Sequence, residues 1–271
     1  MTTTAFSDET SAPALRSALI AGANRGIGRA TALALARDGV DAIITYRSHA
    51  HEADKVVAGI GELRRKAVAF QLDTGEVSSF EAFVAEVTDA LQRTRSRGTF
   101  DFLINNAGMQ ITASFADATE EGFDRMVDVH LKGVFFLTQK LLPLLVDNGS
   151  IVNVSSGTTR FYTPERIVYG AVKGAIEVFT RYLAQELEPR GITVNTIAPG
   201  SSATDFSDGV LRDNQQPREI ITSVTALGRY ATAVDIAGAI AALLGDGNRW
   251  ITGQRIEVSG GMHSSEKDRP R

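Results

Sequence analysis

The stretch Ala18-Leu-Ile-Ala-Gly-Ala-Asn-Arg-Gly-Ile-Gly28 decides the fold, because a short apolar run passes through three glycines straight into a helical pattern. In this context Gly22 allows the tight turn, Gly26 lets the backbone approach a pyrophosphate, and Gly28 permits close packing of helix on sheet. The N-terminus of the helix offers free N–H groups and a positive dipole to phosphate. The stretch therefore predicts a dinucleotide-binding unit at the start of the domain.

Working outward from this loop, short apolar runs alternate with longer amphipathic ones along the chain. The predicted strands are residues 18–21, 42–45, 68–72, 100–104, 150–154, 193–197 and 255–258. Helical patterns separate them, the first over residues 26–37 with Gly39 as its stop signal. Strands that alternate with helices predict an α/β fold in a single domain, a Rossmann-type doubly wound, seven-stranded parallel sheet with helices on both faces.

Composition narrows the class of protein further. The 271 residues are enough for one large domain, expected over residues 15–263, with flexible tails at 1–14 and 264–271. A net charge of −4 gives no reason to expect nucleic acid or a membrane as partner, and the absence of cysteine excludes disulfides and thiolate chemistry. With no signal peptide and no apolar run near the roughly 18 residues that span a bilayer, we expect a cytoplasmic protein.

The stretch Tyr169-Gly-Ala-Val-Lys173 places a phenol and an ammonium group on one face of a helix. Ser156 lies thirteen positions before Tyr169, at the end of an apolar strand. A free phenol has a pKa of about 10, and a neighbouring cation lowers it by favouring the phenolate. The sequence therefore predicts that Lys173 lowers the pKa of Tyr169 and makes it a general acid and base.

The end of the second strand indicates which dinucleotide binds. A site for NAD usually places a carboxylate there to accept hydrogen bonds from the ribose. This chain has Thr45-Tyr-Arg-Ser48 instead. Arg47, and Arg25 in the glycine loop, would suit a 2′-phosphate, which favours NADP(H). The alternative is that both arginines are solvated surface groups.

Together these motifs resemble the short-chain dehydrogenase/reductase family, of the 3-oxoacyl-reductase-like, single-domain type. The glycine loop is similar to the family's TGxxxGxG with Ala21 in place of the usual Thr, and residues 105–108 read Asn-Asn-Ala-Gly, like its NNAG motif. Ser156, Tyr169 and Lys173 fall on its Ser and YxxxK positions. The resemblance implies a reversible, NADPH-dependent reduction of a ketone or aldehyde to an alcohol, with hydride from nicotinamide C4 and a proton from Tyr169. It also implies that Ser156 holds the carbonyl oxygen and that Lys173 binds the nicotinamide ribose.

The same resemblance places the other site residues. The cofactor contacts are expected at Gly22, Asn24, Arg25, Gly26, Ile27, Gly28, Arg47, Ser48, Asp73, Asn106, Ala107, Gly108, Tyr169, Lys173, Pro199, Gly200 and Thr204. Judged from their loops, the residues expected on the substrate side are Gln110, Phe161, Tyr162 and Phe206. This mix mildly favours an uncharged, hydrophobic ketone over a sugar, while a 3-oxoacyl thioester or a steroid stays open. No carboxylate–histidine cluster resembles a metal site.

One position departs from the family pattern. Where the family has a catalytic Asn, in a stretch resembling NLxGxF, this chain has His130. The favoured interpretation is a tolerated polar replacement, with the family's role carried by the backbone carbonyl, so that His130→Asn leaves turnover within about threefold. The alternative is that His130 joins the proton relay, since a free imidazole has a pKa near 6.5.

Two further features leave alternatives open. Residues 201–230 are polar and irregular, which predicts a lid over the site or else a surface excursion. The helical stretches 119–145 and 167–188 fit burial against the sheet or against other subunits, and the resemblance implies a homodimer or homotetramer. A non-catalytic NADP(H) sensor or a scaffold on the same fold is the competing function, although neither needs the intact Ser, Tyr and Lys.

Overall fold

Seven parallel strands form one sheet, in the order β3-β2-β1-β4-β5-β6-β7. This computed structural model describes residues 15–95, 97–203 and 213–262. The strands are β1 (Ser17–Ile20), β2 (Asp41–Tyr46), β3 (Ala67–Gln71), β4 (Phe100–Asn105), β5 (Leu145–Val154), β6 (Thr193–Pro199) and β7 (Arg255–Val258). The predicted doubly wound, seven-stranded parallel sheet is confirmed.

The direction in which strands are added reverses beside β1, where β2 lies on one side and β4 on the other. In register, Ile20 is level with Ile44 on β2 and with Ile104 on β4. The loops that leave the carboxyl ends of β1 and β4 therefore diverge to opposite faces of the sheet. A crevice opens at such a point, and it is where ligands bind in open α/β sheets.

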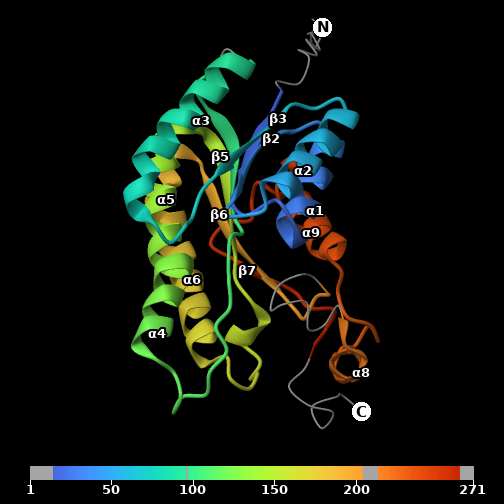
Figure 1. The fold of residues 1–271 in the computed structure, drawn as a ribbon. Coiled ribbons are helices and arrows are strands. Elements are labelled where there is room, and N and C mark those ends of the chain that lie inside the picture. The colour runs from blue at the N-terminus through green and yellow to red at the C-terminus, as the bar shows by residue number, and fades with distance from the viewer. Residues whose placement is uncertain (1–14, 96, 204–212, 263–271) are drawn as a thin grey trace, which may run out of the picture.

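Helices cover both faces of the sheet (Figure 1). On one face lie α1 (Gly26–Arg37), α2 (Ala50–Glu62) and α9 (Ala233–Leu243). On the other lie α3 (Phe80–Arg95), α4 (Glu120–Val127), α5 (Gly133–Leu141) and α6 (Ile167–Glu186). The short helix α8 (Gln215–Ser223) stands apart from both layers, near the carboxyl end of β7.

Two apolar cores, one on each side of the sheet, hold the layers together. Ile20 of β1 and Ile44 of β2 pack with Leu35 of α1 and Ile240 of α9 in one core. Leu19, next to Ile20 on β1, faces the other core. This alternation follows from the two-residue period of a strand. Because both faces are covered, the strands are apolar nearly throughout, which is why their positions could be predicted.

Two helical predictions need correction. The stretch 119–145 is not one regular helix, because a π-helical turn over Asp128–Lys132 separates α4 from α5. It also ends before Leu145, which begins β5, after a short 3₁₀ turn over Leu142–Leu144 that contains a proline. The segment 201–230 is not irregular throughout, since it contains α8.

The predicted tails at 1–14 and 264–271 lie outside the described residues. Within the described part of the chain, no helix is long and apolar enough to cross a membrane.

Candidate functional site

A cavity of about 470 Å³ lies at the carboxyl ends of the strands, at the crevice beside β1. It joins the glycine loop to the predicted catalytic residues. The predicted site residues that line it are Gly22, Asn24, Arg25, Gly26, Ile27, Arg47, Ser48, Asp73, Asn106, Ala107, Gly108, Gln110, His130, Ser156, Phe161, Tyr169, Lys173, Pro199 and Gly200. Thr204 and Phe206 lie outside the described residues.

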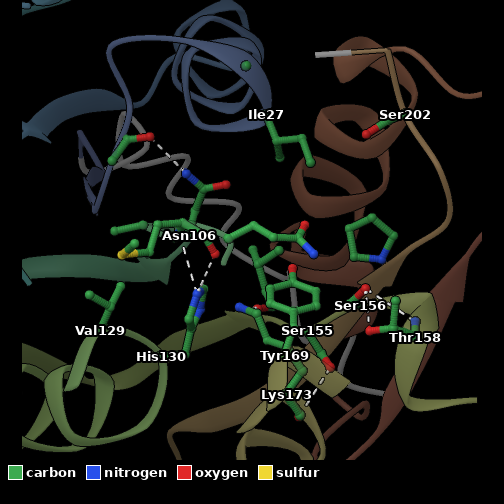
Figure 2. A pocket seen from close by; sticks show the side chains of 18 of the residues that line it. Ile27, Asn106, Val129, His130, Ser155, Ser156, Thr158, Tyr169, Lys173 and Ser202 are labelled. Atoms are coloured by element: carbon green, nitrogen blue, oxygen red, sulfur yellow. Dashed lines mark hydrogen bonds between the residues drawn. The ribbon is translucent and has the colours of Figure 1, made fainter. Parts of the chain in front are cut away.

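The glycine loop is held in a shape that only small residues allow. Gly22 has φ +68°, and a Cβ at this position would lie 2.7 Å from Ala107 Cα. A Cβ on Gly28 would lie 2.3 Å from Gly22 O, so Gly28 supports the loop from behind and does not line the cavity. The Asn106 amide, labelled in Figure 2, donates to Ala21 O at 3.0 Å and to Gly22 O at 2.8 Å. The loop, and with it the start of α1, is thus fixed to the end of β4.

Arg25, Arg47 and Ser48 line the end of the cavity next to β2. Asp73, at the end of β3, accepts hydrogen bonds from Gly75 N at 2.9 Å and from the Arg125 guanidinium at 2.7 Å. Burial alone would raise the pKa of Asp73, but these two partners outweigh it and lower the pKa. Asp73 is therefore ionised and fixed, able to accept a hydrogen bond from an amino group of a ligand.

Ser156, Tyr169 and Lys173 come together from two neighbouring elements (Figure 2). Ser156 follows β5 and begins a 3₁₀ turn, and its hydroxyl accepts from Thr158 N at 3.2 Å. Tyr169 and Lys173 lie on the buried face of α6, with exposed fractions of 8% and 5%. Lys173 Nζ donates to Val154 O at 2.7 Å and lies 5.7 Å from the centre of the Tyr169 ring.

The pKa of Tyr169 differs from the sequence-based expectation. Burial raises it to about 12, against opposing effects of a hydrogen bond with Ser156 and of the Arg166 charge. Burial also lowers the pKa of Lys173 to about 7. The predicted lowering of the Tyr169 pKa by Lys173 is therefore wrong for this structure, because desolvation of the phenolate dominates and Lys173 is bonded to the Val154 carbonyl. At neutral pH Tyr169 holds its proton and can donate it.

Apolar and polar side chains from several other segments also line the cavity that contains Tyr169. They are Met109, Gln110, Phe161, Thr163, Arg166, Pro217, Ile221 and Met262. Two of these, Pro217 and Ile221, come from α8, so this helix lies against the cavity. Tyr162 was predicted here incorrectly. It is 85% exposed and absent from the lining, because the turn that buries Phe161 directs the next residue to solvent.

Arg166 lines the cavity and was not predicted from the sequence. Its position three residues before Tyr169 was the available signal, and in the structure Arg166 is the N-cap residue of α6. Its charge favours the Tyr169 phenolate, although burial lowers the pKa of Arg166 itself.

Glu177, a supporting residue one turn beyond Lys173 on α6, was also missed. It accepts from Ser155 Oγ and from Arg255 Nε on β7, each at 2.8 Å, and Thr159 Oγ1 lies 2.8 Å from the same carboxylate oxygen. The turn that carries Ser156 is therefore tied to both α6 and β7. No local pattern reveals this contact, because Glu177 and Arg255 are 78 residues apart.

Comparison with known proteins agrees with this geometry. The family model described as enoyl-(acyl carrier protein) reductase matches residues 21–263. A 3-oxoacyl-[acyl-carrier-protein] reductase of Staphylococcus aureus is 34% identical over 250 residues, 92% of this chain and 98% of that protein. This chain belongs to the short-chain dehydrogenase/reductase family.

Solved structures of short-chain reductases superpose closely on this one. The reductase LugOII, which catalyses keto-reduction at C1 in lugdunomycin biosynthesis, has a TM-score of 0.86 and 35% identity over 91% of this chain and 96% of its own. The angucycline C-6 ketoreductase LanV, solved with bound NADP, has a TM-score of 0.86 and 34% identity over 91% of this chain and 95% of its own.

Proposed function

We propose that this short-chain dehydrogenase/reductase is an NADP(H)-dependent ketoreductase, which reduces a ketone or aldehyde to an alcohol reversibly. The observation that carries the proposal is that Ser156, Tyr169 and Lys173 line the same cavity as the glycine loop. A sensor or scaffold would need the loop alone. The ketoreductases LugOII and LanV share the fold at about one-third identity, which supports the same reaction class.

The residues present fit a dinucleotide. The glycine loop leaves room for a pyrophosphate next to the N-terminus of α1, whose N-cap residue Arg25 places no side chain on the free N–H groups. Arg25 and Arg47 would hold a 2′-phosphate, Ser48 lies beside them, and Asp73 would accept from the adenine amino group. The structure of LanV with bound NADP supports the proposed preference for NADP(H) over NAD(H).

The reaction divides between the cofactor and this chain's side chains. NADPH supplies the hydride when it is bound. The Ser156 hydroxyl donates a hydrogen bond to the substrate oxygen and so orients the carbonyl. Tyr169 gives its proton to that oxygen, because burial keeps the phenol protonated at neutral pH. Lys173 Nζ, beneath the Tyr169 ring, holds the α6 side of the pocket to Val154 O and would contact the nicotinamide ribose.

The substrate is proposed to be a ketone with a largely apolar body. Met109, Phe161, Pro217 and Ile221 add apolar surface to the cavity that contains Tyr169, and Arg166 adds a charge to the same lining. A 3-oxoacyl thioester is the second candidate, because a 3-oxoacyl reductase is 34% identical over nearly the whole chain.

We also propose that the protein forms a homodimer or homotetramer. On α5 and α6, Phe135, Val178 and Tyr182 expose 42%, 44% and 68% of their surface on the layer that faces away from the sheet. Large apolar side chains gathered on an exposed helical face are typical of subunit contacts. Light scattering that gives a monomer at micromolar concentration would contradict this assembly.

The test of function follows NADPH or NADH oxidation at 340 nm with hydrophobic ketones and 3-oxoacyl thioesters in parallel. Turnover with NADPH is expected for the wild type, and Tyr169→Phe should lose about 10²–10⁴-fold in kcat while it still binds NADPH. Tight NADPH binding without turnover on any carbonyl would instead favour the sensor.

A further inference from the structure

His130 occupies a position that couples the cofactor side of the cavity to Tyr169. It lies on the π-helical turn Asp128–Lys132 between α4 and α5, and its side chain is completely buried. Turns of this kind are rare and often occur at functional sites. The imidazole points to the cavity between the segment after β4 and the Tyr169 ring (Figure 2).

The first contact of His130 is to the backbone of Met109. Its Nε2 atom lies 2.7 Å from Met109 O and 3.3 Å from Met109 N. The shorter distance to the carbonyl decides the tautomer, since a lone pair on Nε2 would repel that oxygen. Nε2–H therefore donates to Met109 O, and Nδ1, which has no hydrogen-bond partner among the described residues, carries the lone pair.

The second contact is to the proton donor itself. The His130 and Tyr169 rings meet edge to face, with centres 5.3 Å apart and an interplanar angle of 86°. Edge-to-face pairs of this kind stabilise the contact beyond the area they bury. His130 Cε1 also closes against Gly108, where an added Cβ would lie 2.9 Å away. One ring thus touches both the segment after β4 and Tyr169.

The surroundings of His130 keep it neutral. Burial, followed by the nearby charge of Lys173, lowers the pKa of His130 well below its usual 6.5, and the Met109 hydrogen bond only partly opposes this. Tyr169 and Lys173 are the titratable groups that face it from α6, while Asp128 and Lys132 on its own turn pair with each other at 3.0 Å. A neutral imidazole of fixed tautomer keeps both contacts, and a proton-shuttling one would not.

We propose that His130 is a positioning residue that ties the Met109 carbonyl to the ring of Tyr169 and so fixes the proton donor relative to the cofactor side of the cavity. The proposal rests on the reductase function given above. It replaces the sequence-based expectation that His130→Asn is nearly silent. An Asn amide is shorter than imidazole and would not reach Met109 O, and it offers no ring to Tyr169.

Three substitutions separate the two contacts. His130→Gln reaches about as far as Nε2 and keeps a donor for Met109 O without the ring. His130→Phe keeps the ring edge against Tyr169 without the donor. His130→Asn removes both, and His51→Gln, at an exposed histidine on α2, is the matched control. Each purified variant is compared for kcat, for ketone KM and for NADPH affinity measured by cofactor fluorescence.

We expect kcat to fall about threefold or more in His130→Gln and His130→Phe, and at least tenfold in His130→Asn, relative to the wild type. The NADPH affinity of all three variants should stay within threefold of the wild type. A merely structural role would lower stability and leave kcat per folded molecule unchanged. That result would overturn the proposal, and so would a kcat for His130→Asn within threefold of the wild type. If His130→Asn does not fold, a kcat within threefold of the wild type for both His130→Gln and His130→Phe would overturn it.

A readout without substrate tests the neutral state of His130. Since its folded-state pKa lies below the unfolded value near 6.5, the unfolded chain takes up the proton first as pH falls. The free energy of unfolding should therefore decline below about pH 6.5 in the wild type, and His130→Gln should show a shallower decline. Equal slopes would contradict the buried neutral imidazole. If the wild type reduces no ketone, the proposed reductase function is wrong. The pH dependence of the free energy of unfolding, together with the NADPH affinity of the variants, would then decide the placement of His130.

Discussion

Removing the charge of Glu177 tests whether the turn that carries Ser156 depends on the ion pair behind it. Glu177 and Arg255 expose 13% and 21% of their side chains and meet at 2.8 Å. Breaking a fully buried pair costs about 3–5 kcal/mol, and an exposed pair is worth about 0–1 kcal/mol. With both side chains partly accessible, Glu177→Gln should cost about 2 kcal/mol. For a domain of this size that corresponds to a loss of about 4–8 °C in Tm.

Calorimetry of the wild type and of Glu177→Gln measures this difference directly. Glu186→Gln, at an exposed glutamate on the same helix, is the matched control and should stay within about 1 °C. Because Ser155 and Thr159 are held by the same carboxylate, kcat should also fall, by less than tenfold. A Tm for Glu177→Gln within 1 °C of the wild type, or a loss matched by Glu186→Gln, would refute the idea that this pair holds the Ser156 turn.

Three further outcomes follow from the charges that line the cavity. Arg47→Ala should raise the KM for NADPH about tenfold or more, since a hydrogen bond to a charged group is worth about 1.5–3 kcal/mol. The KM for NADH should stay unchanged, and equal effects on the KM values of both cofactors would contradict a contact with the 2′-phosphate. Lys173→Met, measured by thermal unfolding, should be more stable than the wild type at pH 6 by about 2 kcal/mol. That advantage should shrink between pH 7 and 10.5, because the folded-state pKa of about 7 lies below the unfolded value and the burial cost of the cation disappears as Lys173 loses its proton. Arg166→Gln should raise the pKa of Tyr169, so that alcohol oxidation, which needs the phenolate, slows more than ketone reduction; equal slowing in steady-state assays of both directions would rule out this charge effect.

The fold could be predicted because its signals are local. The helix Gly26–Arg37 and the strand Arg255–Val258 have the bounds expected from the sequence. A strand buried on both faces is apolar at nearly every position, and a glycine loop between a strand and a helix is typical of a dinucleotide site. The ends of elements were harder where tertiary packing decided them, as at the π-helical turn before Gly133.

Most of the residues that line the candidate site were predicted, but the electrostatics of the site were not. The spacing of Tyr169 and Lys173 correctly placed both on one helical face, but it gave no measure of how deeply α6 is buried. Burial is set by elements far away in sequence, and it reversed the expected direction of the Tyr169 pKa. Phe161 and Tyr162 are both aromatic and adjacent in sequence, yet the first is buried and the second is exposed. The turn that causes this difference is defined only in the folded chain.

The Asn106 amide, which bonds Ala21 O and Gly22 O from the end of β4, has a consequence for the kinetics of binding. The conformational entropy of the glycine loop is lost when the sheet forms, before any dinucleotide arrives. Ordering this loop therefore adds nothing to the free-energy cost of association, which is the advantage of a preorganised site. Association should then be set by diffusion and by the arginines near β2, and a fragment as small as a nucleoside bisphosphate should find the loop already in its binding shape.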